Sequence, residues 1–328
     1  MRFWTGLGKV SAPTEAPAAG LEAGLLEALR QLATTRAARG LADDCAVLDW
    51  PLGLQLVTTQ DMLAEGVLFT PACPPASVGW KLVAVNCSDL AAEGARPVGV
   101  LLGAGIGAGR DLSWALQLVQ GVGAALARFD AALLGGDTIR AGERTVLSLT
   151  AIGSLPAGAA IGRAGAADGD DLWLSGAIGG AGLGLRVVRG GSFGAADALL
   201  LKRYRWPTPR LALGLALRGI ASAMLDVSDG LLLDAARLGE ASGVAIDIDS
   251  ARIPLAAEVR ASGVAVAELA TLGDDYELLF AAPEGKRRQV LQAAEVARVP
   301  VTRIGTVGAG AGVRLDGASP ARLGFLHR

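Results

Sequence analysis

The stretch that decides the fold is WKLVAVNCSDLAA, residues 80–92. Apolar residues recur there every three or four positions, which predicts a helix over 77–93 with one buried face. Asn86 and Asp89 are three residues apart, so their side chains lie on one face of that helix. An Asp in the middle of a helix, beside a buried face, does not cap a helix end. Asp89 is therefore a candidate for function.

Helices and strands are mixed on both sides of this stretch. The expected helices are 21–38, 77–93, 112–129, 179–189, 209–221, 231–241 and 284–297, and the expected strands are 54–59, 98–102, 131–134, 145–152, 171–175, 223–227, 244–248, 276–281 and a final pair. Residues 1–20 are expected to be partly irregular, and 191–207 to be a polar connection. The Pro- and Gly-containing stretch 155–169 is typical of a boundary. We predict an α/β (α+β) protein with domains at 1–155 and 156–328.

Composition excludes several classes of partner. The 328 residues are 52% hydrophobic but only 4% aromatic, and 30 Lys and Arg balance 32 Asp and Glu. A nucleic-acid binder usually shows a basic stripe or a stacking platform, and neither is visible, so we expect no nucleic acid. The longest apolar run, 97–109, is too short to span a membrane. Residues 1–6 lack a signal-peptide pattern, so a cytoplasmic location is expected.

The scarcity of His and Lys excludes several kinds of catalysis. The single histidine, His327, rules out Ser-His-Asp and Cys-His nucleophiles and His-rich zinc sites. None of the four lysines closes a phosphate loop of the G-x-x-x-x-G-K type. Carboxylates, arginines and backbone amides remain, and these groups suit Mg²⁺ and phosphate.

Several aspartates stand in apolar, Gly-flanked surroundings near expected strands and helices: Asp44, Asp61, Asp89, Asp137, Asp226 and Asp229. Taken alone, such an aspartate is more commonly a cap or turn residue, an interpretation that Asp89 fits least. Carboxylates that converge from several strands, however, repel one another unless a cation neutralises them. Since Mg²⁺ uses one or two carboxylates plus substrate phosphates, the set predicts more than one ion.

Eight segments of the chain match a known pattern: 43–46, 59–69, 80–92, 135–138, 161–165, 226–231, 273–278 and 324–327. Read in order, they resemble the thiamine-monophosphate kinase family, of the superfamily that includes aminoimidazole-ribotide synthetase. The resemblance spans residues 40 to 328, and the Asn-x-Ser-Asp-Leu-Ala-Ala and Asp-Tyr-Glu-Leu segments are its most specific parts. It implies a two-domain aminoimidazole-ribotide synthetase-like fold, whose N-terminal domain forms a β-barrel with a second subunit in a homodimer.

The resemblance also implies an activity, which is direct in-line transfer of the γ-phosphoryl group of ATP to thiamine phosphate, without a covalent catalytic residue. By position, several Mg²⁺ ions would be held by Asp44, Thr59, Asp61, Asp89, Asp137, Asp226 and Asp229. ATP would be contacted by Gly136, Asp137, Arg163 and Ser228, and thiamine phosphate by Leu68, Asp274 and Phe325.

Two departures from the family pattern fall among the substrate residues. The family has His where this chain has Leu68, and Glu where it has Asp274. Two alternatives therefore stay open: a paralogue that uses the same ATP site on another acceptor, and a nucleotide-binding protein without turnover. Selenophosphate synthesis is disfavoured because no reactive Cys lies in a Gly-rich N-terminal segment, and the hydrogenase-maturation relative because its C-terminal Cys is absent.

Overall fold

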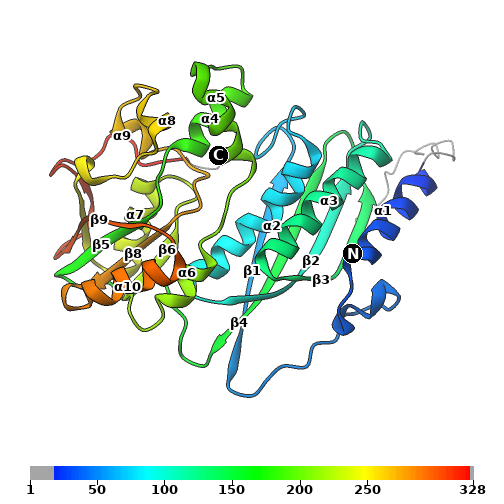
Figure 1. Ribbon diagram of the computed structural model, residues 1–328, viewed down its shortest axis with the longest axis horizontal. Helices are drawn as coiled ribbons and strands as arrows, with labels where there is room; N and C mark the ends of the chain where they lie inside the picture. The colour runs from blue at the N-terminus through cyan, green and yellow to red at the C-terminus, as the bar shows by residue number, and fades with distance from the viewer. Residues whose placement is uncertain (1–17, 326–328) are drawn as a thin grey trace, which may run out of the picture.

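The computed structural model describes residues 18–325, which fold into two domains built on separate β-sheets (Figure 1). In the N-terminal domain the strand order is β1-β4-β2-β3, from β1 (Leu54–Ala64), β4 (Val146–Pro156), β2 (Arg96–Ile106) and β3 (Ala132–Arg140). All neighbours are antiparallel except β2 and β3, which are parallel. Three helices pack over this sheet: α1 (Ala18–Leu32), α2 (Pro75–Ala92) and α3 (Leu112–Phe129).

The two faces of the N-terminal sheet differ because side chains alternate along each strand. On β1, Thr59, Asp61 and Leu63 lie on the more protected face, and Leu63 is buried in the core with α2 and α3. Leu56 and Met62 lie on the opposite face, where each is half exposed. The register therefore assigns Thr59 and Asp61 to the helix side of the sheet.

The C-terminal domain has a mixed sheet of order β10-β7-β9-β5-β8-β6. Its strands are β5 (Asp170–Ser175), β6 (Ala223–Asp226), β7 (Ala245–Ile248), β8 (Leu278–Pro283), β9 (Val301–Gly308) and β10 (Gly312–Leu315). Its helices are α4 (Gly180–Val188), α5 (Asp197–Arg205), α6 (Leu211–Ala216), α7 (Leu231–Ser242), α8 (Ala257–Arg260), α9 (Val266–Leu269) and α10 (Arg287–Ala297). One buried cluster joins α6 and α10 to the sheet and includes the end of α2, whereas α7 packs in a second cluster.

The backbone of helix α2 packs directly against the backbones of α3 and α6, with no side chain between them. A Cβ on Gly79 would lie 2.2 Å from the carbonyl oxygen of Leu118 in α3, and one on Gly121 would lie 1.9 Å from that of Ala76. On the other side, a Cβ on Gly214 in α6 would lie 2.0 Å from a carbonyl oxygen of α2. Glycine is therefore needed at these crossings, and α2 is held between the two domains.

Several expected elements differ in extent from those observed. The strands expected at 54–59 and 131–134 continue to residues 64 and 140 because pairing with β4 and β2 persists, so Asp61 and Asp137 lie within strands rather than after them. The first helix ends at Leu32, and α6 covers only Leu211–Ala216. The expected polar connection at 191–207 contains α5.

Residues 1–17, most of the N-terminal segment expected to be irregular, lie outside the described part of the chain, as does His327. Within residues 18–325 no helix is long and apolar enough to cross a membrane.

The close crossing of α2 and α3 predicts that a Gly→Ala substitution there destabilises the protein, whereas the same substitution in the open part of α1 stabilises it. Gly121→Ala should lower the free energy of unfolding by about 1–3 kcal/mol, because its methyl group collides with backbone. Gly20→Ala in α1 meets no atom within 4 Å, so it should raise that free energy by up to about 1 kcal/mol. Chemical denaturation of both variants checks the pair, and equal effects would contradict the packing described.

Candidate active site

Helix α2 is hydrogen-bonded to both sheets through buried polar side chains. Asn86 accepts a hydrogen bond of 2.9 Å from the Asp61 amide of β1, and its own amide donates to the Leu82 carbonyl. Ser88 donates a hydrogen bond of 2.6 Å to Asp226 Oδ2, at the end of β6. Both Asn86 and Ser88 are fully buried. One helix therefore fixes an aspartate from each domain.

The carboxylates of Asp61, Asp89 and Asp226 line the same cavity and repel one another. Burial, reinforced by the negative charges of Asp89 and Asp61, raises the pKa of Asp226 to about 8. Burial also raises the pKa of Asp89, although Thr59 Oγ1 donates a hydrogen bond of 2.5 Å to its carboxylate and favours the ionised form. We call these three carboxylates the acidic wall of the cavity. A cation bound there would relieve their repulsion.

Side chains of α7 hold the turn that follows β6. The amides of Ser228 and Asp229 both donate to Asp234 Oδ2 at 3.0 Å. Arg237 Nη1 lies 2.7 Å from both Asp229 Oδ2 and Asp234 Oδ1. Burial raises the pKa of Asp234 to about 6, even though these donors favour its ionised form. The turn therefore holds Ser228 and Asp229 in place at the edge of the cavity.

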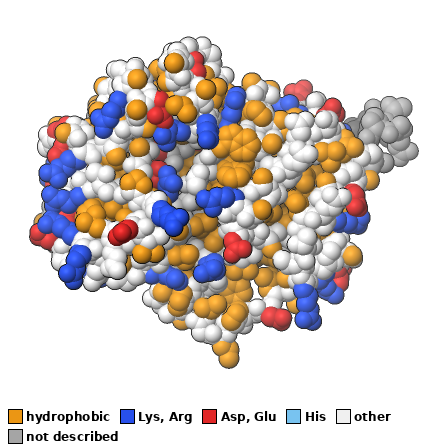
Figure 2. Space-filling view, viewed as in Figure 1, with side chains coloured by type: hydrophobic (Ala, Val, Ile, Leu, Met, Phe, Trp, Pro, Cys, Tyr) orange, Lys and Arg blue, Asp and Glu red, His pale blue; other side chains and the backbone are white. Residues whose placement is uncertain are grey.

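The cavity between the two domains has a volume of about 690 Å³. Its lining includes nine of the predicted site residues, which are Asp61, Leu68, Asp89, Arg163, Asp226, Ser228, Asp229, Asp274 and Phe325. Arginines complete it, namely Arg186, Arg189, Arg237 and Arg322. Figure 2 shows Lys and Arg side chains over the C-terminal domain and along its border with the N-terminal domain. Acidic and basic side chains thus share one cavity, as a site for a phosphate with bound cations requires.

Thr59 does not line the cavity but supports Asp89 through its hydrogen bond. Asp44, Gly136 and Asp137 lie elsewhere. Asp44 is exposed in the segment before β1. Asp137 is paired with Gly103 of β2, Gly103 with Ser148 of β4, and Ser148 with Met62 of β1. Paired residues lie on the same face of a sheet, so Asp137 lies with Met62 on the open face, away from the helices. Within one chain, these three residues are not brought to the acidic wall.

Sequence reasoning missed several residues of the site. Lys81, Asn86, Ser88 and Tyr276 stand in the quoted segments but were given no role, and Tyr204 was not considered. A signal did exist for α2, because Lys81 and Ser88 are seven residues apart, which is two helical turns. Both face the C-terminal domain, where Lys81 meets Asp274 and Ser88 meets Asp226.

Comparison with known proteins agrees with this arrangement. Residues 42–155 match the family model of the AIR synthase related protein, N-terminal domain, and residues 167–317 that of its C-terminal domain. The thiamine-monophosphate kinase of Caulobacter vibrioides is 39% identical over 298 residues, which are 88% of this chain and 84% of that protein.

Two solved structures share the fold over nearly the whole chain. The thiamine-monophosphate kinase of Stenotrophomonas maltophilia is 36% identical, with a TM-score of 0.81, over 90% of this chain and 96% of that one. AaThiL complexed with AMPPCP and TMP is 29% identical, with a TM-score of 0.77, over 97% of this chain and 100% of that one. The chain therefore belongs to the AIR synthase-related family, with its two-domain α/β fold, and within that family to the thiamine-monophosphate kinases.

Proposed function

We propose that this protein transfers the γ-phosphoryl group of ATP to thiamine phosphate, giving thiamine diphosphate. Its main support is the convergence of Asp61, Asp89 and Asp226, from two domains, on one cavity with Arg163. The relatives support the same activity, because they are thiamine-monophosphate kinases and one was solved with AMPPCP, an ATP analogue, and TMP. We place the domain boundary of the proposed enzyme between residues 155 and 156.

The acidic wall fits Mg²⁺ that is shared with a nucleotide. Within residues 18–325 no three His, Cys, Asp or Glu side chains lie close enough to enclose a metal ion. Mg²⁺ bound with ATP needs only one or two carboxylates, because phosphate oxygens and water supply the other ligands. We assign as its carboxylate ligands Asp61, Asp89, Asp226 and Asp229. Such ions neutralise the charge that develops on the transferred group.

The chain's own groups position the reactants. Arg163 is exposed at the cavity and its charge acts on Asp89, so it is placed to contact the nucleotide phosphates. The amide of Ser228 is already committed to Asp234, which leaves the Ser228 hydroxyl for the nucleotide. Leu68, Asp274 and Phe325 line the part of the cavity that we assign to thiamine phosphate. Rate enhancement then comes from positioning and charge neutralisation, as in other phosphoryl transfers.

The open face of the N-terminal sheet supports a homodimer. Five large apolar side chains are exposed on it, at Leu56, Met62, Leu101, Val146 and Ile139. A patch of this kind on a folded protein marks an interaction surface. A second copy on this face would form the expected barrel and cover Asp137. We therefore propose that Gly136 and Asp137 act at the subunit interface, with Asp44 contributed by the segment that precedes β1.

Asp89→Asn tests the acidic wall, because it removes one negative charge and changes shape little. We expect kcat for thiamine diphosphate formation to fall by about 100-fold or more, since the cation that would neutralise the reacting phosphates loses a charged ligand. Asp168→Asn, at an exposed position, makes the same chemical change outside the cavity and should leave kcat unaltered. Coupled assays and thermal unfolding of both variants check this. Nearly full activity of Asp89→Asn in a folded protein would exclude the assigned metal site.

Ile139→Asp tests the proposed interface. Ile139 is 60% exposed, so the folded monomer should tolerate the charge, whereas an apolar interface would be disrupted by it. Sedimentation velocity should show a dimer for the wild type and a monomer for the variant. Val296→Asp, at a 73% exposed site on α10, is the matched control and should stay dimeric. A monomeric wild type, or a variant that dimerises normally, would reject this face as the interface.

A further inference from the structure

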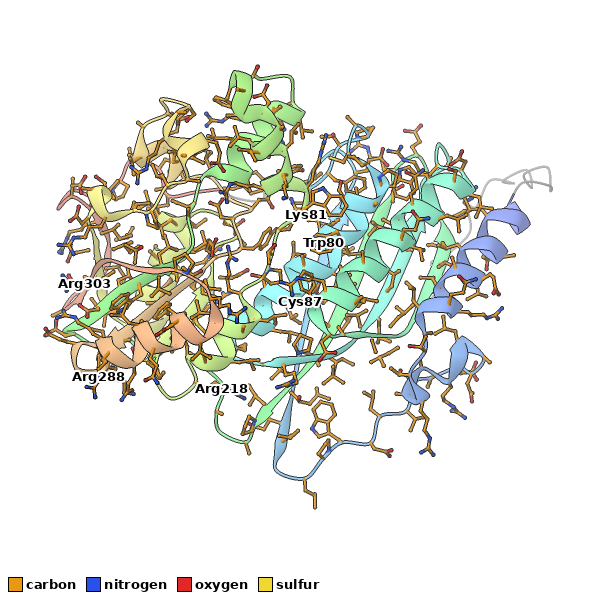
Figure 3. The ribbon with its side chains drawn as sticks, in the orientation of Figure 1. Trp80, Lys81, Cys87, Arg218, Arg288 and Arg303 are labelled. Carbon is orange, nitrogen blue, oxygen red and sulfur yellow. The ribbon has the colours of Figure 1, made fainter. Side chains whose placement is uncertain are left out.

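Lys81 is a buried charge that lies behind the wall of the cavity. The residue is only 3% exposed, and it does not line the cavity. Its Nζ lies 2.9 Å from Asp274 Oδ1, across the domain junction, and 4.0 Å from the centre of the Tyr204 ring. Figure 3 shows Lys81 on the side of α2 that faces the C-terminal domain. A buried ammonium is tolerated only beside compensating groups, and the carboxylate and the ring face supply them.

The two oxygens of Asp274 have different surroundings. Oδ1 accepts a hydrogen bond of 2.9 Å from the Tyr276 hydroxyl, in addition to its contact with Lys81. Burial raises the pKa of Tyr276 well above its usual value, so this hydroxyl stays a donor. Oδ2 accepts no hydrogen bond from any residue between 18 and 325. One oxygen is therefore held by the protein, and the other is left for a ligand in the cavity that Asp274 lines.

The backbone around Asp274 is fixed as firmly as its side chain. Asp274 and Tyr276 have φ values of 72° and 52°, in the left-handed region that is unfavourable for such residues. Their amides donate hydrogen bonds of 2.8 Å to the Ser228 and Val227 carbonyls. Between them, Asp275 accepts bonds from two amides at the start of α4. Backbone in sparsely populated conformations persists where the surroundings fix it, and such places cluster at ligand sites.

The same cluster reaches Leu68. The hydroxyl of Tyr204, whose ring faces Lys81, donates a hydrogen bond of 2.9 Å to the Leu68 carbonyl. Leu68 and Asp274, the two departures from the family pattern among the expected substrate residues, are therefore connected through Tyr204 and Lys81.

We infer that Lys81 is a positioning residue for recognition of the acceptor. Together with Tyr276 it fixes one oxygen of Asp274, so that the other meets a cationic or N–H-donating group of the acceptor molecule. This inference rests on the proposed function, because thiamine phosphate carries both a cationic ring and an amino group. Lys81 acts through Asp274, since its own ammonium is out of reach of the cavity.

Lys81→Met tests this inference with steady-state kinetics for both substrates. The KM for thiamine phosphate should rise by about tenfold or more, while kcat and the KM for ATP stay within about twofold of the wild type. Tyr276→Phe removes the other bond to Oδ1 and should raise the same KM, which keeps the test valid if Lys81→Met does not fold. Lys202→Met, on the exposed side of α5, is the matched control and should change neither constant.

The double variant Lys81→Met, Asp274→Asn separates positioning from a purely structural link between the domains. Removing both charges should restore the melting temperature lost in Lys81→Met, because no buried charge is left unpaired. The KM for thiamine phosphate should nevertheless stay raised. If stability and KM both return to wild-type values, Lys81 is a structural link only and the inference is wrong.

Two other results would also overturn the inference. One is an equal rise of the KM for ATP and for thiamine phosphate, and the other is an unchanged KM for thiamine phosphate in both single variants. A wild-type protein that makes no thiamine diphosphate would instead refute the proposed function, and this inference with it.

Discussion

The close contact of α2 with both domains is the constraint on which the site depends. Three glycines at two helix crossings bring α2 within backbone distance of α3 and α6, so the helix cannot shift without collision. Its polar side chains are positioned by that packing, with Asn86 on the β1 side and Ser88 on the β6 side. The carboxylates of two separate sheets meet because one helix is bonded to both.

Bringing these carboxylates together has an electrostatic cost, because their negative charges repel one another. Asp61, Asp89 and Asp226 are held near one another by packing, and burial raises the pKa of the latter two. Carboxylates in this state bind a divalent cation more favourably than separate, solvated ones do, because the cation removes their repulsion. The arginines that line the cavity all come from the C-terminal domain, and in the proposed enzyme they would attract the polyphosphate of the nucleotide.

Local patterns predicted much of the fold, but features that depend on strand pairing needed the structure. Helix 112–129 was placed at its observed bounds, and Asp89 was singled out, because helical periodicity is visible within a short window. The face occupied by Asp137 was not predictable, since it depends on the register of four strands and on a bulge in β3 at Leu134. The Lys81–Asp274 pair joins residues far apart in the sequence, and only the docking of α2 reveals it.

The central claim is that this cavity transfers a phosphoryl group directly between two bound small molecules. The most direct measurement follows ATP labelled at its γ-phosphate in the presence of Mg²⁺ and thiamine phosphate, with chromatographic separation of the products. The account predicts label in thiamine diphosphate and none on the protein, because no residue of the site is assigned as a covalent carrier. Label found only in inorganic phosphate, or retained on the protein, would contradict it.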